Sequence, residues 1–242
     1  MSIGSAERII VALDGLTPIQ ALEFTASISS LRWVKVGLEL FLAGGAEVVT
    51  QMRNRNLEVF LDLKFHDIPA TMAAACSRAA QLGAGLITVH GAAGLAGLIA
   101  AQQGAQAGAL AADLPMPKLL AVTVLTSWDP LEFANQLAVT EPIDRYVHRL
   151  AKLSAQAGIA GCVCSPLDVA SLRTAHPQPF ALITPGIRPV GSDANDQQRV
   201  LSPAQALAAG ANALVIGRPI TKAINPEIAF AECCRSIEEI SN

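Results

Sequence analysis

Charged residues gather at the end of an apolar run near residue 60. The segment reads DLKFHDIP at residues 62–69 and directly follows VFL. If this run is an extended strand, Asp62 and Lys64 point to one face, because side chains two apart in a strand share a face. Burying these charges, with Asp67 close behind, is costly unless they are paired. Carboxylates beside Lys64 would keep its ammonium charged, which suits electrostatic and proton-transfer chemistry.

The elements that must position these charges are short apolar runs that alternate with longer helical patterns. The runs are continuous in hydrophobicity, which is typical of parallel strands covered on both faces. We predict strands at Ile9–Leu13, Trp33–Val36, Glu58–Leu63, Leu86–Val89, Leu119–Val124, Gly161–Val163, Ala181–Ile183 and Ala213–Ile216.

Helical patterns fill most of the intervals between these strands. We predict helices at Pro18–Leu31, Ala46–Asn54, Thr71–Leu82, Ile143–Ala157, Pro166–Ala175 and Pro203–Ala209, and a short one at Ile220–Ile224. Three of them begin near a proline, whose missing N–H costs little at a helix start. Eight β-α units without a linker predict one (β/α)8 barrel, a single domain over residues 1–242. A doubly wound open sheet is the alternative, but no G-x-G-x-x-G follows the first strand.

In a (β/α)8 barrel the chemistry collects at the carboxyl ends of the strands. An exposed loop would not explain Lys35, which stands between two valines, nor Lys64 between two apolar residues. We therefore interpret the polar strand ends as a site. They are Asp14, Lys35, Asp62 with Lys64, His90, Thr126, Thr184-Pro185-Gly186-Ile187-Arg188 and Gly217-Arg218.

The last two strands predict an anion site. Loops after strands seven and eight of such barrels commonly bind phosphate. Gly217 would let the backbone approach the anion and Arg218 would add a bidentate contact, although a helix-capping glycine and a surface arginine fit equally well. The loop from Gly186 to Val200 is long and polar, as a closing lid would be, and Gln197 could reach an anion from it.

Composition excludes several classes of protein. The formal net charge of -3 gives no basic excess for nucleic acid. Residues 79–112 carry no charge, yet glutamines and glycines leave no apolar run long enough to span a membrane, so we expect a buried strand and an Ala/Gly-rich helix there. No secretion signal is visible at the start, and the five cysteines lack metal-site spacing. We expect inert thiols and a cytoplasmic protein.

Six motifs, in chain order, resemble orotidine 5'-phosphate decarboxylases of the bacterial type. They are VALD (11–14), VKVG (34–37), DLKFHDIP (62–69), LTS (125–127), TPGIR (184–188) and VIGR (215–218). The resemblance implies decarboxylation of orotidine 5'-phosphate to UMP and carbon dioxide, the last step of UMP synthesis, in a (β/α)8 homodimer without a cofactor. It covers essentially the whole chain.

The resemblance also implies roles for individual residues. Lys64 would protonate C6 within a charged array of Lys35, Asp62, Lys64 and Asp67, with Asp67 and Ile68 supplied by the partner subunit. Other implied substrate contacts are Asp14 and Lys35 at the ribose, Thr126 and Ser127 at the pyrimidine, Gln197, Gly217 and Arg218 at the phosphate, Arg188 on the site wall, and Thr71 at the end of the shared segment.

Two other functions stay open at this point. An Asp-x-Lys pattern also occurs in sugar-phosphate decarboxylases and aldolases that use Mg²⁺, here near Asp14 and Asp62. The chain could instead be a catalytically silent nucleotide-binding barrel, which would be expected to have lost one member of the charged array. All four members are present.

Overall fold

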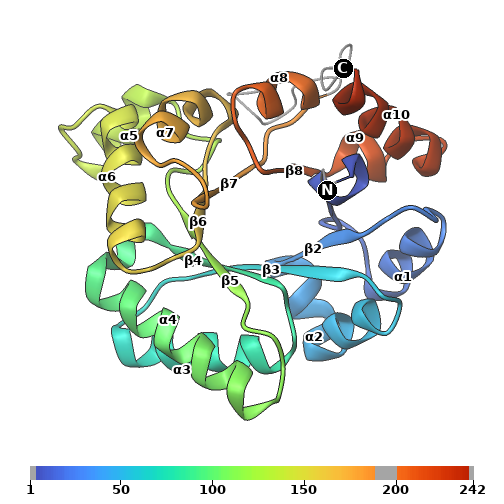
Figure 1. The fold of residues 1–242 in the computed structure, drawn as a ribbon, viewed down its shortest axis with the longest axis horizontal. Helices are drawn as coiled ribbons and strands as arrows, with labels where there is room; N and C mark the ends of the chain where they lie inside the picture. The colour runs from blue at the N-terminus through green and yellow to red at the C-terminus, as the bar shows by residue number, and fades with distance from the viewer. Residues whose placement is uncertain (1–3, 189–200, 240–242) are drawn as a thin grey trace.

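Eight parallel strands close into a barrel in the computed structural model, which describes residues 4–188 and 201–239. The strands lie at the centre and the helices form a ring around them (Figure 1). They are β1 (Ile9–Ala12), β2 (Trp33–Gly37), β3 (Glu58–Phe65), β4 (Leu86–His90), β5 (Lys118–Val122), β6 (Gly161–Val163), β7 (Ala181–Thr184) and β8 (Ala213–Ile216). Because β8 pairs with β1, the sheet has no open edge, and the predicted (β/α)8 fold is confirmed over the open sheet.

The helices occupy the intervals between the strands. They are α1 (Pro18–Ala26), α2 (Leu38–Arg53), α3 (Pro69–Gln81), α4 (Gly94–Ala111), α5 (Pro130–Leu137), α6 (Ile143–Gln156), α7 (Val169–Ala175), α8 (Pro203–Ala208), α9 (Arg218–Thr221) and α10 (Pro226–Glu238). Short 3-10 turns are η1 (Ser5–Arg8), η2 (Gly91–Ala93) and η3 (Pro166–Asp168). Pro18, Pro166 and Pro203 stand at helix starts, as predicted.

Apolar side chains cover both faces of the sheet. Along β1, Ile9 and Val11 join the large cluster that also contains helix residues such as Met72, whereas Ile10 belongs to a second cluster with Phe60 and others inside the barrel. This alternation explains why the strands read as continuous apolar runs. Functional side chains must therefore replace apolar ones on the inner face.

The uncharged stretch at residues 79–112 forms β4 and α4, as expected from the sequence. Glycines let α4 lie directly on α3, because a Cβ atom on Gly104 or Gly108 would collide with the backbone of Ala73 or Ser77. The stretch thus owes its composition to close helix packing. Across the described part of the chain, no helix has the length and apolarity needed to cross a membrane.

Several predicted boundaries were wrong. α2 begins eight residues before the predicted Ala46, because the chain passes Gly45 as a kink, with φ 60°, rather than as a helix end. α5 was not predicted, although Asp129 caps it by accepting from the N–H groups of Leu131 and Glu132. α9 begins at Arg218, ahead of the predicted start at Ile220.

Candidate active site

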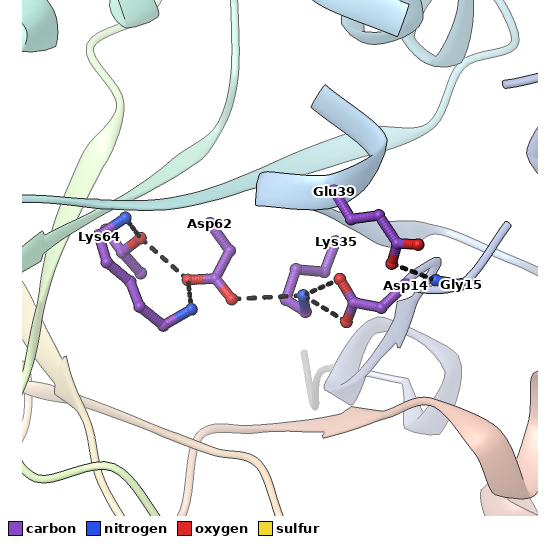
Figure 2. A network of polar contacts seen from close by, with 7 residues as sticks. Asp14, Gly15, Lys35, Glu39, Asp62 and Lys64 are labelled. Atoms are coloured by element: carbon purple, nitrogen blue, oxygen red, sulfur yellow. Dashed lines mark hydrogen bonds and ion pairs between the residues drawn. The ribbon is translucent and has the colours of Figure 1, made fainter. Parts of the chain in front are cut away.

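Four charged side chains form a line across the carboxyl end of the barrel (Figure 2). Asp14 follows β1, Lys35 lies on β2, and both Asp62 and Lys64 lie on β3. Lys35 Nζ is 2.7 Å from Asp14 Oδ2 and 3.3 Å from Asp62 Oδ2, and Lys64 Nζ is 2.9 Å from Asp62 Oδ1. The charges therefore alternate in sign, and each is paired with an opposite one.

Burial makes this pairing strong. Lys35 and Asp62 are buried, whereas 33% of the Lys64 side chain and 50% of the Asp14 side chain remain exposed. Burial acts to raise the pKa of Asp62, but the charges of Lys35 and Lys64, with hydrogen bonds from Lys64 and Thr88, outweigh it and hold that pKa below its usual value. Asp62 is thus a buried anion that forms ion pairs with the ammonium groups of both Lys35 and Lys64.

β3 departs from a regular strand at Lys64, whose φ is 50°. The left-handed region costs a residue with a side chain roughly 1–2 kcal/mol. Leu63 still packs outward against the helix-side core, as the alternation predicts, and Asp62 and Lys64 still meet. The shared face was predicted correctly, but the strand was not expected to distort at Lys64.

Gly37 makes room for the first ion pair. A Cβ atom at this position would collide with Asp14 Oδ1 and come within 2.9 Å of Lys35 Nζ. The turn after β1 is held from the other side, since the N–H of Gly15 donates to Glu39 Oε2 at 2.9 Å (Figure 2). The absence of a side chain at Gly37 and the hydrogen bond between Gly15 and Glu39 therefore position Asp14 beside Lys35.

Two adjoining cavities open beside the array and share the wall formed by Asp14, Lys35, Pro185 and Val215. The first, of about 300 Å³, we name the apolar lobe. Its other lining residues are Phe60, Asp62, Lys64, Val122, Val124, Leu125, Thr126, Ser127, Val163 and Cys164.

The second cavity, of about 380 Å³, we name the cationic lobe. Its other lining residues are Ala12, Gly15, Gly186, Arg188, Gly217, Arg218 and Lys222. A ligand that spans both lobes could place its more apolar part in the first lobe and an anion in the second.

Comparisons with known proteins show the family of the chain. The sequence model of the "Orotidine 5'-phosphate decarboxylase / HUMPS family" matches residues 7–233. The chain belongs to this family.

Individual relatives support the assignment. An orotidine 5'-phosphate decarboxylase of Parasynechococcus marenigrum is 62% identical over 98% of this chain and 96% of its own length. One from a Synechococcus species is 64% identical over 95% of this chain and 94% of its own length. The crystal structure of orotidine 5'-phosphate decarboxylase from Lactobacillus acidophilus aligns with a TM-score of 0.83 at 34% identity, covering 95% of this chain and 98% of that one.

Most residues predicted from the family resemblance line one of the two lobes. Thr126 and Ser127 lie on the apolar lobe, and Arg188, Gly217 and Arg218 lie on the cationic lobe. A Cβ atom on Gly217 would make only ordinary contacts with Ala12, so the glycine is not required by packing within the barrel. Gln197 lies outside the described residues.

Three predicted residues lie away from both lobes of their own chain. Asp67, Ile68 and Thr71 are exposed, and Ile68 is 67% exposed although it is a large apolar residue. The carboxylate of Asp67 accepts a hydrogen bond from the N–H of Ile68. Within the described chain, Asp14 extends the array at its Lys35 end, a contact that the predicted array of Lys35, Asp62, Lys64 and Asp67 did not include.

Sequence reasoning missed three residues of this site. Gly37 was quoted within a motif without a role, and Thr88 was not singled out. Lys222 was also missed, although its spacing of four from Arg218 is the one that brings helical side chains to one face. Thr88 carries no signal of this kind, because its contact with β3 depends on strand register.

The described residues contain no group of three or more histidine, cysteine or acidic side chains arranged to hold a metal ion. The two aspartates that a Mg²⁺-dependent relative would use, Asp14 and Asp62, are instead bridged by Lys35. The ammonium of Lys35 thus lies between the two carboxylates, at the place where the Mg²⁺-dependent alternative would need the metal ion.

Proposed function

We propose that this chain decarboxylates orotidine 5'-phosphate to UMP and carbon dioxide. The observation that carries the proposal is the ammonium of Lys64, which is paired with the buried anion Asp62 on the wall of the apolar lobe. The cationic lobe adjoins it along Asp14 and Lys35, so one nucleotide can reach both. The names of the similar proteins described above support the same reaction.

The reaction explains why an ammonium is needed. When the bond between C6 and the carboxylate breaks, carbon dioxide leaves and the electron pair stays on C6 in the plane of the ring. At about 4 Å, an opposite unit charge stabilises that pair by roughly 4 kcal/mol at an effective dielectric near 20, against about 1 kcal/mol in water. Lys64 then transfers a proton from Nζ to C6 and regains one from solvent.

Asp62 has two effects in this scheme. Its negative charge pairs with the ammonium of Lys64 at 2.9 Å and holds it on the wall of the apolar lobe. It also lies on the wall of the lobe that would receive the substrate carboxylate, so the two anions repel until carbon dioxide leaves. Lys35 holds Asp62 from the other side and limits its movement.

The rest of the nucleotide fits the remaining walls. We assign the pyrimidine to the apolar lobe beside Thr126 and Ser127, and the ribose to Asp14 and Lys35 on the shared wall. The phosphate takes the cationic lobe, with Arg188, Gly217, Arg218, Lys222 and, from the loop outside the described residues, Gln197. Binding energy from this remote group can order the reacting end.

We further propose that the enzyme is a homodimer with shared active sites. Within one chain Asp67 takes no part in the array, and Ile68 exposes its side chain to solvent beside it. Both observations are accounted for if Asp67, Ile68 and Thr71 reach the substrate of a second copy. Such a contact would complete the array of Lys35, Asp62, Lys64 and Asp67.

The decarboxylation is tested by mixing purified protein with orotidine 5'-phosphate and following the ultraviolet absorbance change, with UMP identified by chromatography. We expect equal rates with and without EDTA, because the scheme uses no metal. Loss of activity in EDTA would favour the Mg²⁺-dependent alternative. Absence of turnover in both samples would favour a silent nucleotide-binding barrel.

The shared site is tested by mixing two inactive variants, Lys64→Ala and Asp67→Ala. Random exchange makes half of the dimers hybrids, and each hybrid has one site with both native residues, so about a quarter of wild-type activity should return. Recovery requires the two residues to come from different subunits. If the mixture stays inactive while native mass spectrometry shows that hybrids form, Asp67 acts within its own chain.

We also propose that the chain works as one catalytic domain in the cytoplasm. All five cysteines are free thiols, and burial raises the pKa of Cys76 and Cys233 to about 12, which leaves them unreactive. Free thiols are typical of a reducing compartment. A fluorescent fusion that fails to fill the cytoplasm would contradict this location.

A further inference from the structure

The hydroxyl of Thr88 connects the carboxylate of Asp62 to the backbone N–H of Lys64. Thr88 lies on β4, is 0% exposed and lines neither lobe. Its Oγ1 donates a hydrogen bond to Asp62 Oδ1 at 3.0 Å and accepts one from the backbone N–H of Lys64 at 2.9 Å. One buried hydroxyl therefore uses its donor and one of its acceptor positions on the residues that carry the proposed chemistry.

The register of the sheet explains why this hydroxyl is needed. Leu61 pairs with Ile87 and Phe65 pairs with Val89, so four steps along β3 correspond to two steps along β4. The extra length of β3 bulges opposite Thr88, where the regular backbone ladder is interrupted. The side chain of Thr88 takes the place of a backbone acceptor for the N–H of Lys64.

The same bulge contains the left-handed residue. Lys64 has a φ of 50°, a conformation that persists only where the surroundings hold it. Within the described structure, the bond from its N–H to Thr88 fixes the backbone and the bond from its Nζ to Asp62 Oδ1 fixes the ammonium. Because Thr88 also binds that same carboxylate oxygen, both ends of Lys64 depend on one hydroxyl.

We propose that Thr88 is a positioning residue for proton transfer to C6. Its hydroxyl holds the bulge of β3 and the carboxylate of Asp62, so that the ammonium of Lys64 stays aimed into the apolar lobe. This inference rests on the proposed function, since it assumes that Lys64 is the proton donor. Thr88 itself does not touch the substrate, because it lines neither lobe.

Loss of the Thr88 hydroxyl should slow catalysis without weakening the binding of the phosphate. Replacing Thr88 by valine keeps the shape and burial but removes the hydroxyl, which leaves the N–H of Lys64 without this acceptor and Asp62 without this donor. Lys64 can then leave its left-handed conformation. Thr88 does not line the cationic lobe, so the affinity for the phosphate end should be unchanged.

The test compares Thr88→Val with Thr88→Ser in the full-length enzyme. We expect kcat of Thr88→Val to fall about 10- to 100-fold while KM and the dissociation constant of UMP change less than about threefold. Thr88→Ser keeps the hydroxyl and should restore kcat to within about threefold. The exchange of the C6 hydrogen of UMP for deuterium in D2O, which reports proton transfer alone, should slow in parallel with kcat.

Thr25→Val is the matched control. Thr25 is also a buried threonine, 6% exposed, but it lies on α1, lines neither lobe, and its hydroxyl donates to the carbonyl of Leu22 and not to the array. The control should lose stability without losing kcat. Equal losses of kcat in Thr88→Val and Thr25→Val would show a general packing effect and overturn the proposal.

Two other results would also overturn it. One is wild-type kcat in Thr88→Val, and the other is a loss that appears in KM rather than in kcat. If Thr88→Val is insoluble, Thr88→Cys replaces it, and its weaker hydrogen bonds should give an intermediate loss; wild-type kcat there counts against the proposal. A wild-type enzyme without turnover, or an active Lys64→Ala variant, would instead refute the proposed function.

Discussion

The two lobes of the cleft hold their charges in different ways. On the side of the apolar lobe, Lys35, Asp62 and Lys64 form contacts of 2.9–3.3 Å with charges of opposite sign, so this end is organised before any substrate arrives. On the described wall of the cationic lobe, Asp14 is the one acidic residue among several cations, including Arg218 and Lys222. The first arrangement suits a reaction, and the second suits capture of an anion.

The two lobes should therefore contribute to different kinetic parameters. A preorganised array needs no rearrangement at the moment of reaction, so its contribution appears in the rate of the chemical step. A cluster of cations gains most when a dianion neutralises it, so its contribution depends on the phosphate. Mutations in the two lobes should therefore differ both in size and in kinetic signature.

The largest effect is expected for Lys64→Ala. It removes both the charge beside C6 and the proton donor, so kcat should fall by more than about 10⁴-fold, while circular dichroism shows a folded protein. Lys152→Ala, which removes an exposed lysine on α6, is the control and should keep full activity. Ordinary turnover in Lys64→Ala would remove Lys64 from its assigned role.

Arg218→Ala should have a smaller effect that depends on the substrate. We expect kcat/KM for orotidine 5'-phosphate to fall about 10- to 100-fold through the loss of charge-assisted hydrogen bonds, and kcat/KM for orotidine, which lacks the phosphate, to change little. Arg235→Ala on α10 is the surface control. Equal losses for both substrates would contradict a phosphate role for Arg218.

Gly37→Ala tests the wall that the lobes share. The added Cβ would displace Asp14 and press on Lys35, so kcat/KM should fall roughly 10-fold, the order of one lost charged hydrogen bond. Gly4→Ala adds the same methyl group where nothing lies within 4 Å and should be silent. An unchanged kcat/KM in Gly37→Ala would mean that the Asp14–Lys35 pair tolerates displacement.

The smallest effect is expected from His90, near the edge of the array, which should make the stability of the fold depend on pH. Burial, with the charges of His66 and Lys64, lowers the pKa of His90 below its usual value, and its ring stacks on His66 at a centroid distance of 5.0 Å. Below pH 6.5 the unfolded chain therefore gains a proton that the folded chain resists, so folding loses stability as the pH falls.

Urea unfolding at pH 7.5 and pH 5.5 measures this dependence. The free energy of unfolding should decrease more over this interval in the wild type than in His90→Gln. The pKa of His176 is also lowered by burial, but His176 is present in both proteins and its effect cancels in the comparison. An equal decrease in the free energy of unfolding in the two proteins would show that protonation of His90 is not linked to folding.

The sequence by itself determined the barrel and most of the site. Eight continuous apolar runs indicated strands buried on both faces, and the polar residues that follow them had to meet at one end of a closed parallel sheet. Lys35 and Asp62 were identifiable because a charged residue between apolar neighbours on a buried strand needs a partner. The order of the motifs along the chain supplied the resemblance to the family.

Only the tertiary structure decided how the charges are joined. The line of ion pairs includes Asp14, and Asp67 remains on the surface of its own chain. Gly37 leaves space for Asp14, 23 residues earlier, and Thr88 bonds to Asp62 and Lys64 across the sheet. These contacts depend on strand register and on the bulge in β3. Both arise only when the strands pair, so they cannot be predicted from residue spacing along a single strand.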